Sequence, residues 1–89
     1  MTEPYKILLI DDHPLMRKGM RQILELETDF VVVGEASNGS EGVAQALKLQ
    51  PDLIMLDLNM KGISGLDTLR SLRAHDMNAR VVVLTVSDE

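Results

Sequence analysis

Hydrophobic residues form four short, continuous runs along the chain and do not alternate with polar residues inside them. The runs cover residues 6–10, 31–33, 53–56 and 81–84. Three of the four are rich in Ile or Val, which fit the pleated surface of a strand. Continuous apolar runs of this length are typical of strands that are buried on both faces. We therefore predict four buried strands.

The first stretch between these runs has the spacing of an amphipathic helix. It extends from Pro14, which suits the first helical position because its missing N–H needs no partner there, to about Glu27. One apolar stripe is predicted to face the sheet. Its members are Met16, Met20, Ile23 and Leu24.

Two further helices are predicted by the same reasoning. The second runs from about Ser40 to Leu49 and is stopped by Pro51. The third follows Ser64, which forms a capping-box pattern with Asp67. The residues expected to face inward are Val43, Ala46 and Leu47 in the second helix, and Leu66, Leu69 and Leu72 in the third.

Strands that alternate with helices predict an α/β domain with a parallel sheet and right-handed crossovers. Three helices must divide two and one between the faces of such a sheet, so one face is expected to be thinly covered. The last apolar run would form an exposed, apolar edge strand. Further sequence, a homodimer or a domain-swapped oligomer would supply the missing cover.

Acidic residues follow two of the predicted strands. Asp11 and Asp12 come after the first strand, and Asp57 ends the third. Ligands of open parallel sheets bind at the carboxyl ends of the strands, so these side chains are expected to converge. Carboxylate oxygens are the ligands that Mg²⁺ prefers, and an Asp beside a bound metal can act as a nucleophile toward phosphorus. Thr85, after the fourth strand, could donate its hydroxyl to a phosphoryl oxygen.

Simpler interpretations exist for each of these residues. Asp12 or His13 could cap the helix that starts at Pro14. Thr85 could be an ordinary strand residue. Neither His13 nor His75 has a partner at ligand spacing, so surface roles are expected for both.

Three basic residues of the first helix, namely Arg17, Lys18 and Arg21, are expected to form a solvated face. They are also candidates for docking an acidic partner.

The composition of the chain argues against several classes of protein. The chain has 89 residues, which is one domain at most, and it has no cysteine. Its net charge of −5 argues against direct nucleic-acid binding. No apolar run can span a bilayer and no basic leader precedes the first run, so a cytoplasmic protein without membrane contact is expected. Neither a P-loop nor a dinucleotide-binding glycine motif is present.

An ordered set of motifs resembles the receiver domain of bacterial response regulators, in the NarL/FixJ group. The set consists of residues 9–14, residues 52–60 and residues 84–87. Residues 60–69 and 84–88 are particularly similar to nitrate/nitrite transcription regulators of that group. The resemblance covers the whole chain. Lys61 departs from most receivers, which have proline at that position.

The resemblance implies a doubly wound parallel sheet of the flavodoxin/CheY-like kind. Receivers continue with a further helix, strand and helix that carry a lysine and an aromatic switch residue, and in this group a DNA-binding domain follows. We therefore expect residues 1–89 to be a receiver domain that is incomplete at the C-terminus, with no DNA-binding domain.

Roles for individual residues also follow from the resemblance. Asp57 would be the phosphoacceptor, and Mg²⁺ would be held by Asp11, Asp12, Asp57 and the backbone carbonyl of Asn59. Thr85 would be the switch hydroxyl. The phosphoryl donor would be a sensor histidine kinase that docks on the first helix, which gives Arg17, Lys18 and Arg21 their candidate role.

The expected function is therefore a phosphoacceptor in two-component signal transduction. Such a domain is not an enzyme beyond its own phosphorylation and dephosphorylation. The alternative is a docking module that is not phosphorylated and competes for the kinase. A Mg²⁺-dependent phosphatase is disfavoured, because Asn59 stands where a second acid is expected.

Overall fold

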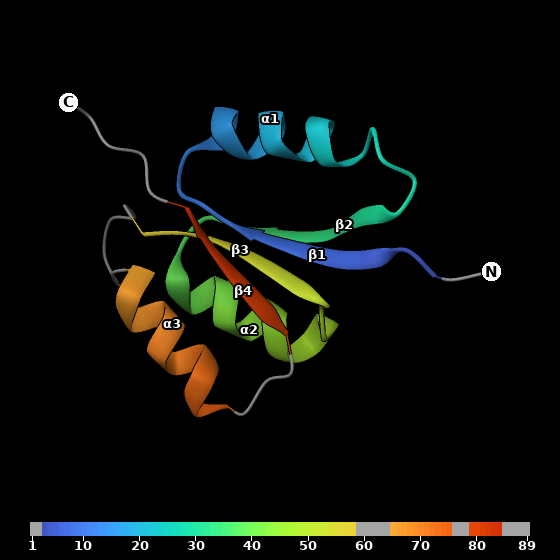
Figure 1. Ribbon diagram of the computed structural model, residues 1–89. Helices are drawn as coiled ribbons and strands as arrows, with labels where there is room; N and C mark the ends of the chain where they lie inside the picture. The colour runs from blue at the N-terminus through green and yellow to red at the C-terminus, as the bar shows by residue number, and fades with distance from the viewer. Residues whose placement is uncertain (1–2, 59–64, 76–78, 85–89) are drawn as a thin grey trace.

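Four parallel strands form one sheet in the order β2-β1-β3-β4, with three helices packed against it (Figure 1). The computed structural model describes residues 3–58, 65–75 and 79–84. The elements in chain order are β1 (Tyr5–Ile10), α1 (Pro14–Leu24), β2 (Phe30–Ala36), α2 (Gly39–Leu49), β3 (Leu53–Asp57), α3 (Gly65–Ala74) and β4 (Arg80–Leu84). This order confirms the predicted α/β alternation and the parallel sheet.

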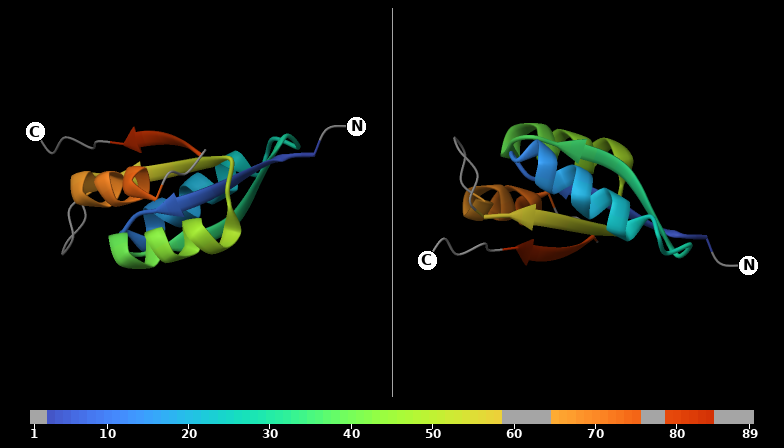
Figure 2. Two further views of the ribbon diagram at one scale, coloured as in Figure 1. Left: turned by 90° about the horizontal axis from the view of Figure 1, so that it is seen from below. Right: turned by 90° about the horizontal axis from the view of Figure 1, so that it is seen from above.

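The helices divide between the two faces of the sheet as predicted. Helices α2 and α3 lie side by side on one face, and α1 lies on the other, as the views in Figures 1 and 2 show. The apolar strand β4 is at an edge, where Val82 and Val83 are 42% and 38% exposed.

The strand register aligns the carboxyl ends of β1 and β3. Ile10 pairs with Leu56, so the residues that follow them leave the sheet together. Asp57 pairs with Leu84 on the other side, and the Leu58 N–H donates to the Leu84 carbonyl at 3.1 Å. The end of β3 is therefore held between two neighbouring strands.

Two elements have bounds that differ from the predicted ones. Helix α1 ends at Leu24 and not near Glu27, because the next turn tightens: Leu26 N–H donates to the Ile23 carbonyl at 3.2 Å. Strand β2 extends from Phe30 through Gly34 and Glu35, beyond the apolar run 31–33. Because β2 pairs along the whole length of β1, the polar residue Glu35 also becomes part of the sheet.

The core has two parts, one on each face. On the α2/α3 face, Leu8, Ile10, Ile54 and Leu56 of the strands are fully buried. The helices add Ala46 and Leu72 to this cluster. On the α1 face, the buried residues are Ile7, Leu9 and Val32, all from strands. Met20 and Leu24 of α1 pack on them without being fully buried themselves.

Several residues predicted to face inward are exposed. On α1, Met16 is 45% and Ile23 68% exposed, because a single helix covers its face and lies open along its flanks. On α2, Leu47 is 41% exposed, although Val43 and Ala46 pack inward as predicted.

Helix α3 packs Leu69 and Leu72 inward as predicted, but not Leu66. Its buried residues are Gly65, Thr68 and Leu72, while Leu66 is 51% exposed. A side chain at Gly65 would collide with the backbone of Asp57 and Leu58, so this glycine lets the start of α3 approach the end of β3. The predicted capping residue Ser64 lies outside the described residues. Within the part of the chain that is described, no helix has the length and apolar character needed to cross a bilayer.

Candidate functional site

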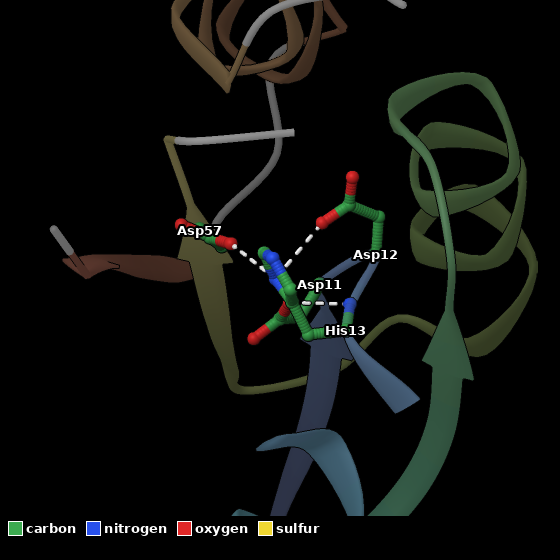
Figure 3. Close-up of side chains that lie close together, drawn as sticks. All are labelled: Asp11, Asp12, His13 and Asp57. Atoms are coloured by element: carbon green, nitrogen blue, oxygen red, sulfur yellow. Dashed lines mark hydrogen bonds and ion pairs between the residues drawn. The ribbon is translucent and has the colours of Figure 1, made fainter. Parts of the chain in front are cut away.

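Three carboxylates and one imidazole meet at the carboxyl edge of the sheet (Figure 3). Asp11 and Asp12 follow β1, and Asp57 is the last residue of the adjacent strand β3. One ligand atom from each of Asp11, Asp12, His13 and Asp57 lies within 4.8 Å of all the others. The predicted convergence of the three aspartates is confirmed, and His13 joins them.

Two of the carboxylates are buried, and backbone contacts hold Asp11 in place. Asp11 is 2% and Asp57 4% exposed. The Asp11 N–H donates to the Ala36 carbonyl at 3.0 Å, which ties the residue to the end of β2. Its Oδ1 atom accepts the His13 N–H at 2.8 Å, which shapes the turn into α1. These contacts fix the carboxylate before any ligand arrives.

His13 lies among the carboxylates, so the predicted surface role was wrong. Its Nδ1 atom is 2.9 Å from Asp11 Oδ1, 3.0 Å from Asp12 Oδ1 and 3.5 Å from Asp57 Oδ2 (Figure 3). The hydrogen bond with Asp11, followed by the charge of Asp12, raises the pKa of His13 above its usual 6.5. The direct succession Asp-Asp-His was the one sequence signal for this arrangement.

The capping interpretation of this segment is not supported for His13. It occupies the N-cap position of α1, but its side chain makes no capping hydrogen bond and its ring faces the carboxylates. Asp12 is not the N-cap residue. His75, by contrast, is exposed just after α3, and its Nδ1 atom contacts the carbonyl of Ser71 in that helix at 2.8 Å.

The basic face of α1 is more ordered than predicted, because Glu35 of β2 binds two of its residues. Arg17 Nε donates to Glu35 Oε1 at 3.3 Å, and Arg21 Nη1 donates to Glu35 Oε2 at 2.8 Å. This contact is the first cause of the raised pKa of Arg21. Lys18 is exposed. The solvated-face prediction therefore holds for Lys18 and for Arg21, whose side chain is 47% exposed although it binds Glu35, and not for Arg17.

Arg17 also contacts the turn that carries the acidic residues. Its Nη1 atom donates to the backbone carbonyl of Asp11 at 2.7 Å. Arg17 is only 18% exposed at its side chain, so this hydrogen bond is partly shielded from water. The guanidinium thus joins the Asp11 turn to Glu35 and links two strand ends through α1.

The donor set fits a divalent cation. Carboxylates this close repel one another, and a positive charge among them, from protonated His13 or from a metal ion, offsets that repulsion. Mg²⁺ takes oxygen ligands and keeps several waters, which a site open on one side allows. Asp12 is half-buried and His13 is exposed, so the site opens to solvent on their side. Asn59 and Thr85, the other predicted site residues, lie outside the described residues.

Comparison with known proteins identifies the class. The family model of the response regulator receiver domain matches residues 7–89. The chain therefore belongs to the response regulator receiver domain family. The fold is the receiver fold that the resemblance implied.

Two curated relatives are nitrate/nitrite response regulators. The chain is 58% identical over 88 residues to a nitrate/nitrite response regulator protein homolog from Haemophilus influenzae. It is 54% identical over 86 residues to the nitrate/nitrite response regulator protein NarL from Escherichia coli. These alignments cover 99% and 97% of the chain, but only 42% and 40% of the relatives. The chain spans about two fifths of the length of these curated relatives.

Solved structures show the same fold. The signal receiver domain of the response regulator NarL from Mycobacterium tuberculosis superposes with a TM-score of 0.91 at 32% identity, covering 99% of this chain and 71% of that one. The CheX–CheY–BeF3–Mg²⁺ complex from Borrelia burgdorferi has a TM-score of 0.88 at 26% identity, covering 98% and 66%.

Proposed function

We propose that this chain is the phosphoacceptor of a two-component signalling system, with Asp57 as the residue that receives the phosphoryl group. Receiver domains are signalling modules that sensor histidine kinases phosphorylate, and they bind Mg²⁺ at an acidic site. The observation that carries the proposal is the meeting of Asp11, Asp12 and Asp57 within one cluster at the carboxyl edge of the sheet.

The proposed transfer is a substitution at phosphorus. An Oδ atom of Asp57 attacks the phosphorus of a phosphohistidine, the new O–P bond forms, and the N–P bond to the imidazole breaks. The burial of Asp57 and its pairing in β3 hold the nucleophile in one place. A Mg²⁺ ion bound there would offset the negative charge of the phosphoryl oxygens.

The residues proposed to hold the ion are Asp11, Asp12 and Asp57, whose oxygens fit Mg²⁺. The resemblance adds the Asn59 carbonyl as a ligand and the Thr85 hydroxyl as the group that senses the phosphoryl oxygen. Mg²⁺ in the CheX–CheY–BeF3–Mg²⁺ complex of a receiver relative supports the choice of ion.

The kinase is proposed to dock on α1. Leu15 is 85% exposed on this helix, and Lys18 is exposed close to it. An apolar and a basic residue on one exposed helix suit a partner helix with an acidic flank. Relatives that share 54–58% identity with the chain are named nitrate/nitrite response regulators, so the signalling system is proposed to control transcription in response to these anions.

Phosphorylation of the chain by the small donor phosphoramidate tests the proposal without a kinase. The wild-type chain should gain one acid-labile phosphate in the presence of Mg²⁺ and none in EDTA, as measured by intact mass spectrometry. Asp57→Asn should gain none, because the amide is not a nucleophile. Asp67→Asn is the matched control, since Asp67 lies exposed on α3 and pairs with Arg70 at 3.6 Å.

Either of two results would contradict the assignment. The first is undiminished phosphorylation of Asp57→Asn. The second is equal loss in Asp67→Asn, which would show that the effect does not belong to the site.

A further inference from the structure

His13 brings a nitrogen atom into a pocket of oxygen ligands. Its Nδ1 atom lies 2.9 Å from Asp11 Oδ1 and 3.0 Å from Asp12 Oδ1. Neighbouring ligands on an octahedral ion with bonds of about 2.1 Å are about 3.0 Å apart. The distances in the pocket are those of a hydrogen bond and an ion pair, and they also match the spacing of ligands that share one ion once Nδ1 gives up its proton.

The third carboxylate fits the same arrangement. Asp57 Oδ2 lies 3.5 Å from Nδ1, and the whole set of donor atoms falls within 4.8 Å. Opposite ligands on such an ion are about 4.2 Å apart, so a set whose atoms lie within 4.8 Å of one another can close on one cation by small side-chain movements. The nitrogen points toward the carboxylates although most of the His13 side chain, 60%, is exposed.

The backbone holds His13 in this position. Its N–H donates to Asp11 Oδ1 at 2.8 Å, and its backbone is extended, with φ −102° and ψ 103°. Pro14 follows directly and disfavours a helical conformation for the preceding residue. The imidazole is therefore placed by the turn and not only by attraction to the acids.

We propose that His13 Nδ1 is a ligand for first-row transition dications, so that the pocket binds these ions through nitrogen and oxygen and binds Mg²⁺ through oxygen alone. The proposal rests on the metal site of the proposed function and adds a second class of ion to it. Imidazole suits transition dications, whereas Mg²⁺ prefers carboxylate, carbonyl and water oxygen. Loss of His13 should therefore weaken one class of ion and spare the other.

Titration of the chain with Co²⁺ and, separately, with Mg²⁺ tests this inference by calorimetry. His13→Ala should weaken Co²⁺ binding by about tenfold or more and change the Kd for Mg²⁺ by about twofold at most. His75→Ala is the matched control, because this exposed histidine follows the end of α3 and contacts the Ser71 carbonyl, and it should change neither value. Far-UV circular dichroism of each variant verifies the fold.

A spectroscopic readout separates ligation from a general effect on the pocket. Co²⁺ bound to Nδ1 should shift the ring N–H proton of His13 far outside the normal NMR range. This signal should be present in the wild type and in His75→Ala, and absent in His13→Ala.

Unchanged Co²⁺ affinity in His13→Ala, or a shifted signal that survives in it, would overturn this inference alone. If the wild type binds neither Co²⁺ nor Mg²⁺, the proposed metal site is itself wrong. This result is distinct from one in which both ions bind but His13→Ala has no effect on Co²⁺.

Discussion

The two faces of the sheet are built in different ways. On the α2/α3 face, helix residues are fully buried against the strands, and small residues let the helices approach. On the α1 face, the helix, whose residues are all described, buries none of them fully. The α1 face instead provides charged contacts from Arg17 and Arg21 to Glu35 and to the Asp11 turn. Both faces thus bury strand residues, but the helices of the α2/α3 face contribute buried residues to that packing, whereas α1 adds charged contacts that reach the site.

Glycines show the same contrast. A Cβ atom at Gly42 of α2 would lie 2.5 Å from Ile10 Cδ1 and 2.9 Å from its Cγ1 atom, and Ile10 is fully buried. A Cβ atom at Gly19 of α1 would meet nothing within 4 Å. Helix α2 is therefore fitted closely to the sheet at Gly42, whereas α1 leaves open space at Gly19.

The largest expected effect comes from the core of the packed face. Leu8→Ala removes a fully buried side chain and should lower the free energy of unfolding by about 2–5 kcal/mol. Ile23→Ala, on α1, should change it by about 0.5 kcal/mol or less, since Ile23 is 68% exposed. Urea unfolding followed by circular dichroism measures both. A similar decrease in the free energy of unfolding in both variants would contradict the proposed difference in packing between the two faces.

Replacing a glycine by alanine should change the stability in opposite directions on the two faces of the sheet. Gly42→Ala should destabilise the protein by about 1–3 kcal/mol, because the buried Ile10 has no room to move. Gly19→Ala should stabilise it by about 0.4–1 kcal/mol, because alanine restricts the unfolded chain and favours the helix. Thermal melts of the two variants give the comparison. Two shifts in the same direction would argue against close packing on only one face.

The smallest effect concerns the link from α1 to the site. Arg17→Ala removes the hydrogen bond to the Asp11 carbonyl, worth about 0.5–1.5 kcal/mol, so Mg²⁺ binding should weaken roughly two- to tenfold. Arg21→Ala removes a contact to the same Glu35, and none of its contacts in the structure reaches Asp11. Its Mg²⁺ affinity should equal that of the wild type in calorimetry. Equal weakening in both variants would assign the effect to Glu35 and not to the turn.

The sequence predicted the features that depend on periodicity and on the ends of strands. Continuous apolar runs predict all four strands, and their parallel order predicts that Asp11, Asp12 and Asp57 lie together. The reason is general: parallel strands put their carboxyl ends at one edge.

Features set by contacts between distant segments were not predictable in the same way. The exposure of Ile23 and Leu66 depends on how each helix is turned against the sheet, and an apolar stripe does not specify that rotation closely. The binding of Arg17 and Arg21 by Glu35 joins residues of α1 and β2 that no motif connects. The inward position of His13 depends on one turn. The roles of Asn59 and Thr85 stay predictions.

The most direct test of the account is an amide ¹H–¹⁵N NMR titration of the chain with Mg²⁺. Well-dispersed signals are expected before the ion is added, because backbone hydrogen bonds hold Asp11 and strand pairing holds Asp57. Addition of Mg²⁺ should shift signals near Asp11, Asp12 and Asp57 and leave those of the packed face, such as Ala46 and Leu72, unchanged. Shifts spread over the whole chain, or no shifts at the three aspartates, would contradict a preformed cation site at the carboxyl edge of this sheet.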